Sequence, residues 1–493
     1  MRARRRAPPV IPALAAGATG ALLALLSSNG LVGERAVFSS LTLLLLLYNG
    51  IEIGRVRRVH PDRWLLNPVV VASVLTFCLG FGFSNFLFFL PAESIRLVGL
   101  IPDVTPAMVK LMWLVLIAAI GMWLGYWSSL AAKISGPKAQ RLVSRWFRNS
   151  DSPRKLALPT LVLVSLVARL AQIKLGVFGY SSSYDRLVEL GSVTQYLAMG
   201  ASLGSVALVV ASLDLFSDRP RPSARLWFAL VVVVEVVLGL LSGFKSAVAM
   251  PFVIVGVCKY LRSGRLPLVW VAWFVMAIVL AYAVIEPFRA QSNLDPSFQA
   301  TSIVEILDNF VASGGQQEKH DAKAPLWLSM LARSSYGHIG SLGVSFRDER
   351  DELPEGSPKF MRNLLLAPAY AFVPRLIWPS KPLGNLGLWY TQVVIGLNHF
   401  SSTAMGPVTY LYFAGGALVV FMGFMGFGIL HRILFFLARP DLGAPRALFY
   451  LGMLSSVSLI NSAVDGAVVS IFRLLVLLLV LQLVVYRRRA VVR

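Results

Sequence analysis

The sequence predicts an all-α polytopic membrane protein. Of its 493 residues, 56% are hydrophobic and only 14% are charged, and the mean hydropathy is +0.70. Soluble proteins carry roughly 25% charged residues. A chain this apolar needs many membrane-spanning helices to bury its hydrophobic surface, which excludes a soluble globular class.

Twelve apolar runs meet or approach the length of about 20 residues that a spanning helix needs. They lie at about 10–28, 36–53, 69–90, 108–131, 156–175, 195–216, 226–243, 246–260, 267–286, 406–430, 447–464 and 466–486. The first run also has the pattern of a secretory signal peptide, but a second span follows almost at once, which favours an uncleaved helix. We therefore divide the chain into 1–288 with spans one to nine, 289–405 as a large outer loop with short helices, and 406–493 with spans ten to twelve.

The formal net charge of +22 follows this topology. Basic residues cluster before the first span and then at every second connection, so the positive-inside rule places these connections and both termini in the cytoplasm. The clusters are scattered over short loops without interleaved aromatic residues, which disfavours nucleic acid as a partner. Cys78 and Cys258 lie in apolar runs, and no CxxC, HExxH, P-loop or GxGxxG pattern stands out, so neither a disulfide nor a metal site is predicted.

The loop at 289–405 carries signs of its own structure. A loop this long inside a compact protein is usually functional. Ser302 and Glu305 form a capping-box pattern that opens a helix. Pro325 can open a second helix, which carries Arg333, Tyr336 and His338. A third apolar helix, at about 359–371, leads into the sequence FVPRLIWPSKP at 372–382.

This last stretch is stiff and cationic. Each of its prolines fixes φ and pushes the preceding residue towards extended geometry, so Arg375 and Lys381 are held in defined places. One interpretation is a proline-rich loop with two solvated cations. The alternative is one wall of a binding site, because further cations share the outer side of the predicted topology: Arg169, Lys174, Arg186, Lys245, Arg289 and Arg333. Clustered Arg and Lys at an outer leaflet suit a phosphate or diphosphate head group.

Ionisable residues within the spans are functional candidates by default, because burying charge in a membrane is costly. Arg169 lies in the outer half of the fifth span, and Glu235 lies near the middle of the seventh. Glu235 precedes Lys245 by ten residues, so at the rise of a helix it is expected about 15 Å deeper in the membrane than Lys245. Asp465 and Arg473 can instead form a structural ion pair or another polar contact between helices.

The proline stretch resembles the outer-loop signature of the Wzy-type polymerases of O-antigen and exopolysaccharide repeat units. Both have an apolar-Pro-Arg-x-Ile-Trp-Pro-x-Lys-Pro pattern. Five further segments are similar in placement: Arg333 to Tyr336 before the signature, Ser401 to Thr403 and Tyr410 to Gly416 after it, Gly179 to Tyr184 after the fifth span, and Ser242 to Ser246 after the seventh.

The resemblance implies a GT-C-like glycosyltransferase of the bacterial cytoplasmic membrane, with its active site on the outer face and with no metal or other cofactor. Such an enzyme transfers a growing glycan from one undecaprenyl-diphosphate carrier to the non-reducing-end sugar of another lipid-linked repeat unit. The implied partners are these lipid-linked donors and acceptors, membrane lipid, a flippase and chain-length regulator proteins.

This chemistry assigns roles to residues as hypotheses. Fixed cations would stabilise the charge that grows on the diphosphate leaving group, and a general base must reach the acceptor hydroxyl. The catalytic candidates are His338 as the first base, Asp185 as the second, and Arg333 and Arg375. The candidates for binding diphosphate or sugar are Arg169, Lys245, Arg289, Lys381, Tyr180 and Trp378. Tyr180 and Trp378 can equally be aromatic residues of the membrane interface.

Three rival functions remain open. An O-antigen ligase would share the carrier and the outer loop but use another acceptor. A transporter or flippase is allowed by the twelve spans and Glu235, although the predicted cations lie on one side. A structural subunit of an export complex is the third, and the clustering of cations disfavours it.

Overall fold

The computed structural model describes most of the chain, and every regular element in that part is a helix. The described residues are 10–28, 32–147, 152–182, 186, 189–265, 267–294, 302–308, 325–373, 377–378, 381, 386–397, 403–458 and 463–487. Within them, Pro153 and Tyr486 form an isolated β-bridge. Ten helices among these described residues are long and apolar enough to cross a membrane. The protein is therefore an all-α multi-pass membrane protein, as the composition predicts.

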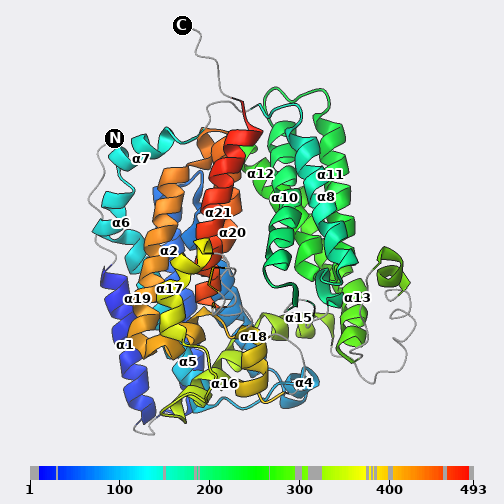
Figure 1. The fold of residues 1–493 in the computed structure, drawn as a ribbon. Coiled ribbons are helices and arrows are strands. Elements are labelled where there is room, and N and C mark those ends of the chain that lie inside the picture. The colour runs from blue at the N-terminus through cyan, green and yellow to red at the C-terminus, as the bar shows by residue number, and fades with distance from the viewer. Residues whose placement is uncertain are drawn as a thin grey trace. The chain divides into compact units, whose positions relative to one another are not determined.

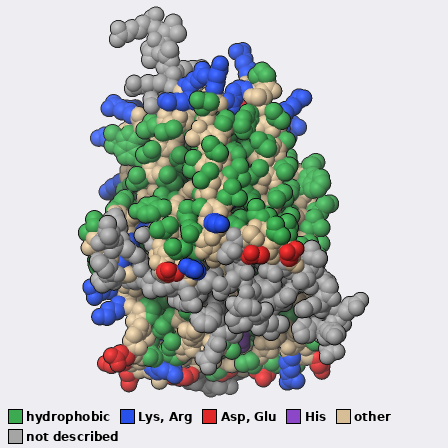
Figure 2. Space-filling model, turned by 45° about the vertical axis from the view of Figure 1, so that its right-hand side comes forward, with side chains coloured by type: hydrophobic (Ala, Val, Ile, Leu, Met, Phe, Trp, Pro, Cys, Tyr) green, Lys and Arg blue, Asp and Glu red, His purple; other side chains and the backbone are tan. Residues whose placement is uncertain are grey.

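Ten of the twelve predicted spans coincide with these helices. They are Glu34–Val59, Pro68–Phe89, Pro106–Trp127, Ala157–Lys174, Val193–Leu215, Ala224–Leu241, Lys245–Ser263, Leu268–Ile285, Pro407–Leu442 and Val464–Val485. The other two predictions fall on α1 (Val10–Ser28) and α20 (Ala444–Ser458), which are helical but do not meet the same criterion of length and hydropathy over the described residues. Figure 2 shows hydrophobic side chains over most of the visible flank of the helices, with Lys and Arg at the upper edge and both basic and acidic side chains at the lower edge.

The chain divides into two compact units (Figure 1). The first unit comprises residues 1–144, 322–438 and 453–475, and the second comprises 145–321, 439–452 and 476–493. Helices α20 and α21 (Val464–Val485) each contribute to both units. These units are defined by contacts in space, whereas the division at 288 and 405 follows spans and loop along the chain and stays a prediction.

The first unit is built around two long helices. Its elements are α1, α2 (Glu34–Val59), η1 (Trp64–Leu66), α3 (Pro68–Ala72), η2 (Ser73–Gly82), η3 (Phe83–Phe89), α4 (Ala92–Leu97), α5 (Pro106–Trp127), α6 (Ser129–Ile134), α7 (Pro137–Ser144), α15 (Leu326–Ser334), α16 (Gly337–Asp348), α17 (Phe360–Phe372), α18 (Leu386–Trp389), η6 (Tyr390–Val394) and α19 (Pro407–Ala438). A Cβ atom on Gly125 would lie 2.0 Å from the Met425 carbonyl oxygen, and one on Gly428 would lie 1.9 Å from that of Met122. Small residues thus let α5 and α19 pack backbone to backbone, as is common between membrane helices.

The second predicted loop helix is two helices. Helix α15 ends at Ser334, and α16 begins at Gly337, so Arg333 and His338 lie on different helices. The Tyr336 amide donates to the Gly80 carbonyl oxygen at 3.1 Å instead of continuing the helix. A Cβ atom on Gly80 would lie 2.6 Å from the Tyr336 ring, so this close tertiary contact explains the break. At the first loop helix, the Glu305 amide donates to Ser302 Oγ at 3.2 Å, which confirms the predicted N-cap.

The second unit is a helix bundle. Its elements are α8 (Ala157–Lys174), η4 (Gly179–Ser181), α10 (Ser192–Leu215), α11 (Ala224–Leu241), α12 (Lys245–Ser263), α13 (Leu268–Leu294) and η7 (Pro440–Leu442). Helices α8, α10, α11 and α12 are packed against one another around a core that includes Leu161, Leu208, Val231 and Val255. At one end of these helices lie Arg219 and Arg221 in the α10–α11 loop, Lys259 and Arg262 in the last two turns of α12, and Arg265 in the loop after it. The α11–α12 turn lies at the opposite end.

Candidate functional site

A cavity of about 550 Å³ lies within the second unit. Its walls come from α8, α10, α11 and α12, from the connection after α8 and from the α11–α12 turn. The lining residues are Arg169, Gln172, Val177, Phe178, Gly179, Ser182, Ala198, Ala201, Ser205, Glu235, Leu238, Gly239, Ser242, Phe244, Ser246, Ala247, Met250 and Pro251. The cavity is therefore mostly apolar, with several hydroxyl groups and one pair of opposite charges. Mostly apolar walls with a few convergent polar groups are typical of small-ligand sites.

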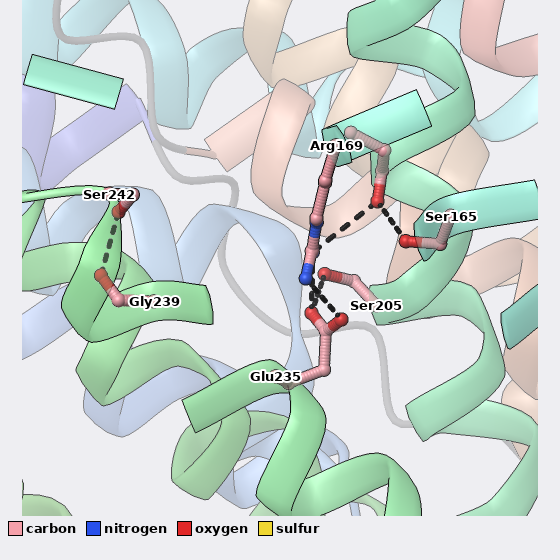
Figure 3. Close-up of polar contacts among 7 residues, drawn as sticks. Ser165, Arg169, Ser205, Glu235, Gly239 and Ser242 are labelled. Atoms are coloured by element: carbon pink, nitrogen blue, oxygen red, sulfur yellow. Dashed lines mark hydrogen bonds and ion pairs between the residues drawn. The ribbon is translucent and has the colours of Figure 1, made fainter. Parts of the chain in front are cut away.

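The charge pair joins Arg169 of α8 to Glu235 of α11 (Figure 3). Arg169 Nη1 lies 2.8 Å from Glu235 Oε1, and Nη2 donates to Oε2 at 3.0 Å. The Nη1 contact is an ion pair without hydrogen-bond alignment, so Nη1 has no aligned acceptor among the residues described. The two side chains are only 13% and 6% exposed, so each charge depends on the other for compensation.

Helix α10 completes the polar cluster. Ser205 Oγ donates to Glu235 Oε2 at 3.4 Å. The Ala201 carbonyl oxygen accepts from Ser165 Oγ at 2.9 Å and from Arg169 Nη2 at 3.4 Å. Ser165 precedes Arg169 by one turn of α8, so both side chains reach the same point on α10. Three helices are thus joined by polar contacts inside the membrane-spanning bundle.

A glycine makes room for the carboxylate. A Cβ atom on Gly204 would lie 2.1 Å from Glu235 Oε1 and 2.7 Å from Ser165 Oγ. Any side chain at this position would displace Glu235 from its contact with Arg169. The arrangement therefore requires the small residue on α10 as well as the charged residues on α8 and α11.

The connection after α8 is fastened to the α11–α12 turn at the cavity rim. The Tyr180 amide donates to the Ser242 carbonyl oxygen at 2.8 Å. Gly179 has a φ of +64°, and a Cβ atom there would lie 2.3 Å from the same carbonyl oxygen, so only glycine fits. The Tyr180 and Phe244 rings meet edge to face, with centroids 6.0 Å apart. Two segments singled out in the sequence, after the fifth and the seventh spans, therefore lie together.

Lys245 is the first residue of α12. Its Nζ lies 3.6 Å from the centroid of the Tyr282 ring on α13, which is a cation–π contact. Lys245 and Tyr180 adjoin lining residues but are not among those that line the cavity. Arg289 lies in α13, and its side chain is outside the described residues, as is the whole of Asp185.

The other predicted site residues belong to the first unit. His338 lies in the first turn of α16 and is half-buried, and this burial lowers the pKa of its imidazole from 6.5. The neutral imidazole that a general base requires is therefore the form favoured at neutral pH. Arg333 lies near the end of α15, with its side chain outside the described residues, and Arg375 lies wholly outside them.

The described part of the proline stretch is attached to the end of α17. Lys381 Nζ donates to the carbonyl oxygens of Tyr370 and Val373, the latter at 3.3 Å. The Trp378 and Tyr370 rings meet at 5.1 Å between centroids. Lys381 thus interacts with the negative end of the helix dipole. This contact gives Lys381 a structural role, and its predicted contact with phosphate stays a prediction.

Arg473 of α21 meets the same helix end. It donates to the carbonyl oxygens of Ala371 and Tyr370, both at 3.1 Å. The predicted polar contact between helices is confirmed for Arg473, and its acceptors are backbone carbonyl groups of α17.

The pairing of Arg169 with Glu235 is the feature that the sequence left unassigned. Both residues stand out as charges within spans, but sequence spacing does not reveal which spans are neighbours. Ser165 and Ser205 belong to no motif in the sequence, so the sequence did not mark them as members of the site. Among the residues described, no group of three or more His, Cys, Asp or Glu side chains could hold a metal ion.

Comparisons with known proteins identify a family without an assigned function. No curated protein and no solved structure matches the chain. A family model described as a domain of unknown function, DUF8712, matches residues 165–457. The match begins at Ser165, includes the whole cavity and extends through α15 to α19. It covers more than half of the sequence, and the chain therefore belongs to the DUF8712 family.

Proposed function

We propose that this protein is a polysaccharide polymerase that joins lipid-linked repeat units. The donor is a growing glycan on undecaprenyl diphosphate, and the acceptor is the non-reducing-end sugar of a second carrier-linked unit. A bond forms between the acceptor oxygen and the anomeric carbon of the donor, while the bond from that carbon to the diphosphate breaks. The acceptor hydroxyl proton passes to a general base, and the diphosphate lipid leaves.

One observation carries the proposal. Arg169, the segment after α8 and the α11–α12 turn were selected from three separate parts of the sequence, and all three contribute to one cavity: Arg169, Gly179, Ser182, Ser242, Phe244 and Ser246 line it. The cavity has the size and the mixed polar and apolar walls that suit a sugar, since hydroxyl groups bond polar substituents and aromatic rings cover apolar faces.

The ion pair refines the assignment of charge. Glu235 compensates Arg169, so the cavity offers little net positive charge to a diphosphate. We therefore assign the cavity to a sugar of the glycan, with Arg169 orienting it through Nη1. The growing charge of the leaving group is assigned to Arg333 and Arg375, with Lys245, Arg289 and Lys381 as further candidates, and proton transfer to His338 or Asp185.

The proposal includes a topology and an architecture. Twelve spans, both termini in the cytoplasm and a GT-C-like arrangement follow from the positive-inside rule and from the family resemblance. In that orientation the Arg-rich loops of the second unit face the cytoplasm, and the α11–α12 turn faces the outer side. The family resemblance implies that this membrane is the bacterial cytoplasmic membrane.

The decisive test uses purified protein and a lipid diphosphate-linked repeat unit, with and without EDTA. We expect polymer in both conditions, because no step is assigned to a metal. Arg333→Ala and Arg375→Ala should each lower the rate by about 100-fold or more, as the loss of one electrostatic contact to a transition state does. Lys359→Ala, an exposed residue outside all the proposed sites, is the matched control. Normal long polymer from either arginine variant contradicts the assignment.

A ligase is the nearest alternative, because it would use the same carrier and similar cations. A deletion strain separates the two. Single repeat units at the cell surface indicate a lost polymerase. Carrier-linked long chains that never reach their final acceptor indicate a lost ligase.

A transporter is the second candidate, and the cavity itself favours it. An Arg–Glu pair facing a cavity between membrane-spanning helices is also found where a polar ligand crosses. Reconstituted vesicles distinguish this function: movement of the lipid-linked unit between leaflets without growth of the glycan supports transport, and growth without movement supports polymerisation.

A further inference from the structure

Two short helices follow directly on a membrane span. Helix α5 ends at Trp127, and α6 and α7 occupy 129–134 and 137–144 (cyan in Figure 1). Because α5 crosses the membrane, the residues that follow it emerge at the membrane surface. This holds for either orientation of the protein and does not depend on the proposed function.

The two helices are held in a defined geometry. The Ala131 amide donates to Ser128 Oγ at 3.1 Å, which caps α6. Gln140 Nε2 donates to the Ser135 carbonyl oxygen at 2.9 Å, which fixes α7 to the end of α6. Ala131 and Ser135 are buried at 0% and 4% exposure, and both helices pack on α19 within the first unit. One side of this helical pair is therefore occupied by protein.

The other side combines large apolar side chains with cations. Leu130, Ile134 and Leu142 are 54%, 40% and 55% exposed. The cations Lys133, Lys138 and Arg141 are also exposed. No acidic residue occurs between Asp103 and Asp151, so these positive charges have no carboxylate nearby in the sequence. In water this surface would leave three apolar side chains unburied.

We infer that this face of α6 and α7 is a docking surface for anionic phospholipid in the leaflet where α5 ends. Apolar side chains of an interfacial helix insert at the boundary between head groups and acyl chains, while Lys and Arg contact lipid phosphate groups. Nucleic acid would pair with the cations but leave the leucines and Ile134 in water. An acidic protein partner would have to compete with the lipid head groups, because the segment emerges at the membrane surface.

The test uses the full-length protein in nanodiscs of phosphatidylcholine, with or without phosphatidylglycerol. Native mass spectrometry counts the phosphatidylglycerol molecules retained on release. We expect the wild type to retain phosphatidylglycerol preferentially and the triple variant K133Q/K138Q/R141Q to lose most of that preference. The control R96Q/K359Q/R362Q removes the same charge from exposed positions elsewhere in the first unit and should behave as the wild type. Equal retention by both triple variants overturns the inference.

A second measurement addresses insertion and does not need the charge variants. A fluorophore attached at L142C should be quenched by brominated lipid and emit at shorter wavelength than in water. Both natural cysteines, Cys78 and Cys258, are buried, so labelling can be directed to the new thiol. Unquenched, water-like emission from a protein with wild-type melting temperature overturns the inference, whichever molecule the cations bind.

Discussion

Arg169 and Glu235 show how one residue depends on another inside a membrane. Each side chain alone would be an unpaired charge in an apolar bundle. Burying such a charge costs free energy, which a charge at the surface does not. Paired at 2.8 Å, they form a neutral polar group that still directs donors and acceptors towards the cavity. Under the proposed function, the same pairing makes Arg169 a weaker candidate for binding the diphosphate than its position in the sequence predicts.

Removing one partner of this pair should be strongly destabilising. We expect Glu235→Ala to lower the free energy of unfolding by about 3 kcal/mol, because it leaves Arg169 buried and uncompensated. The double variant that also carries Arg169→Ala should recover part of this loss, since no lone charge remains. Thermal unfolding in one detergent measures all three proteins.

The exposed pair Arg186 and Glu189 provides the control. These side chains are 59% and 64% exposed at an ion-pair distance of 3.2 Å. Glu189→Ala should change stability by no more than about 1 kcal/mol, as exposed pairs do. A Glu235→Ala protein as stable as Glu189→Ala would show that the buried pair contributes little.

At the scale of elements, glycines set how closely the helices approach. Gly204 lets α10 lie against the Glu235 carboxylate, and Gly179 lets the segment after α8 close on the α11–α12 turn. The shape of the cavity therefore depends on two glycines, Gly204 and Gly179, which have no functional group of their own. The end of α17 has a different kind of fixation, because cations from α21 and from the proline stretch meet its last carbonyl groups.

Enlarging Gly204 should disturb the site through packing. Gly204→Val places new atoms where Glu235 Oε1 and Ser165 Oγ lie, and overpacking of this kind costs about 1–3 kcal/mol. We also expect loss of polymerisation, since the Arg169 contact is displaced. Melting temperature and polymer length report the two effects separately.

Gly50 is the matched control for this substitution. It lies in α2, and a Cβ atom there would meet nothing within 4 Å. Gly50→Val should be neutral or slightly stabilising, because valine favours a helix more than glycine does. If Gly204→Val has wild-type stability and makes polymer of normal length, the close contacts of Gly204 do not restrict the size of the side chain at this position.

At the scale of the whole molecule, acid should weaken the fold partly through His60. This residue follows α2, and its ring contacts those of Phe435 and Phe436 at 5.1 and 5.4 Å. Burial, together with Arg63 and Arg432, lowers the pKa of His60 from 6.5 to about 4. The unfolded chain therefore binds a proton between these values that the folded chain rejects, so stability is complete above about pH 6.5 and declines as the pH falls towards 4.

The variant His60→Phe isolates this contribution. It keeps an aromatic ring beside the two phenylalanines and removes the titrating group. We expect its melting temperature to fall less than that of the wild type between pH 7.5 and pH 5. Parallel falls in the two proteins would exclude His60 as a source of acid sensitivity.

Much of the architecture was predictable because a membrane imposes simple rules on sequence. Span length and apolar composition located ten of the helices, and the capping pattern at Ser302 located the start of another. The continuous helix expected from Pro325 to His338 was wrong, because a tertiary contact of Tyr336 with Gly80 interrupts it. A local sequence pattern holds no information on a contact between residues so far apart in the chain.

The sequence by itself determined that this is an all-α multi-pass membrane protein, and it selected Arg169 and Glu235 as charges that need an explanation. Hydropathy determines which segments enter a membrane, because water and lipid act on each segment separately. Only the tertiary structure decided that these two residues are partners and that the segments at Gly179 and Ser242 share one cavity. The physical reason is that contacts between helices depend on packing across distant parts of the chain, which spacing along a single helix does not encode.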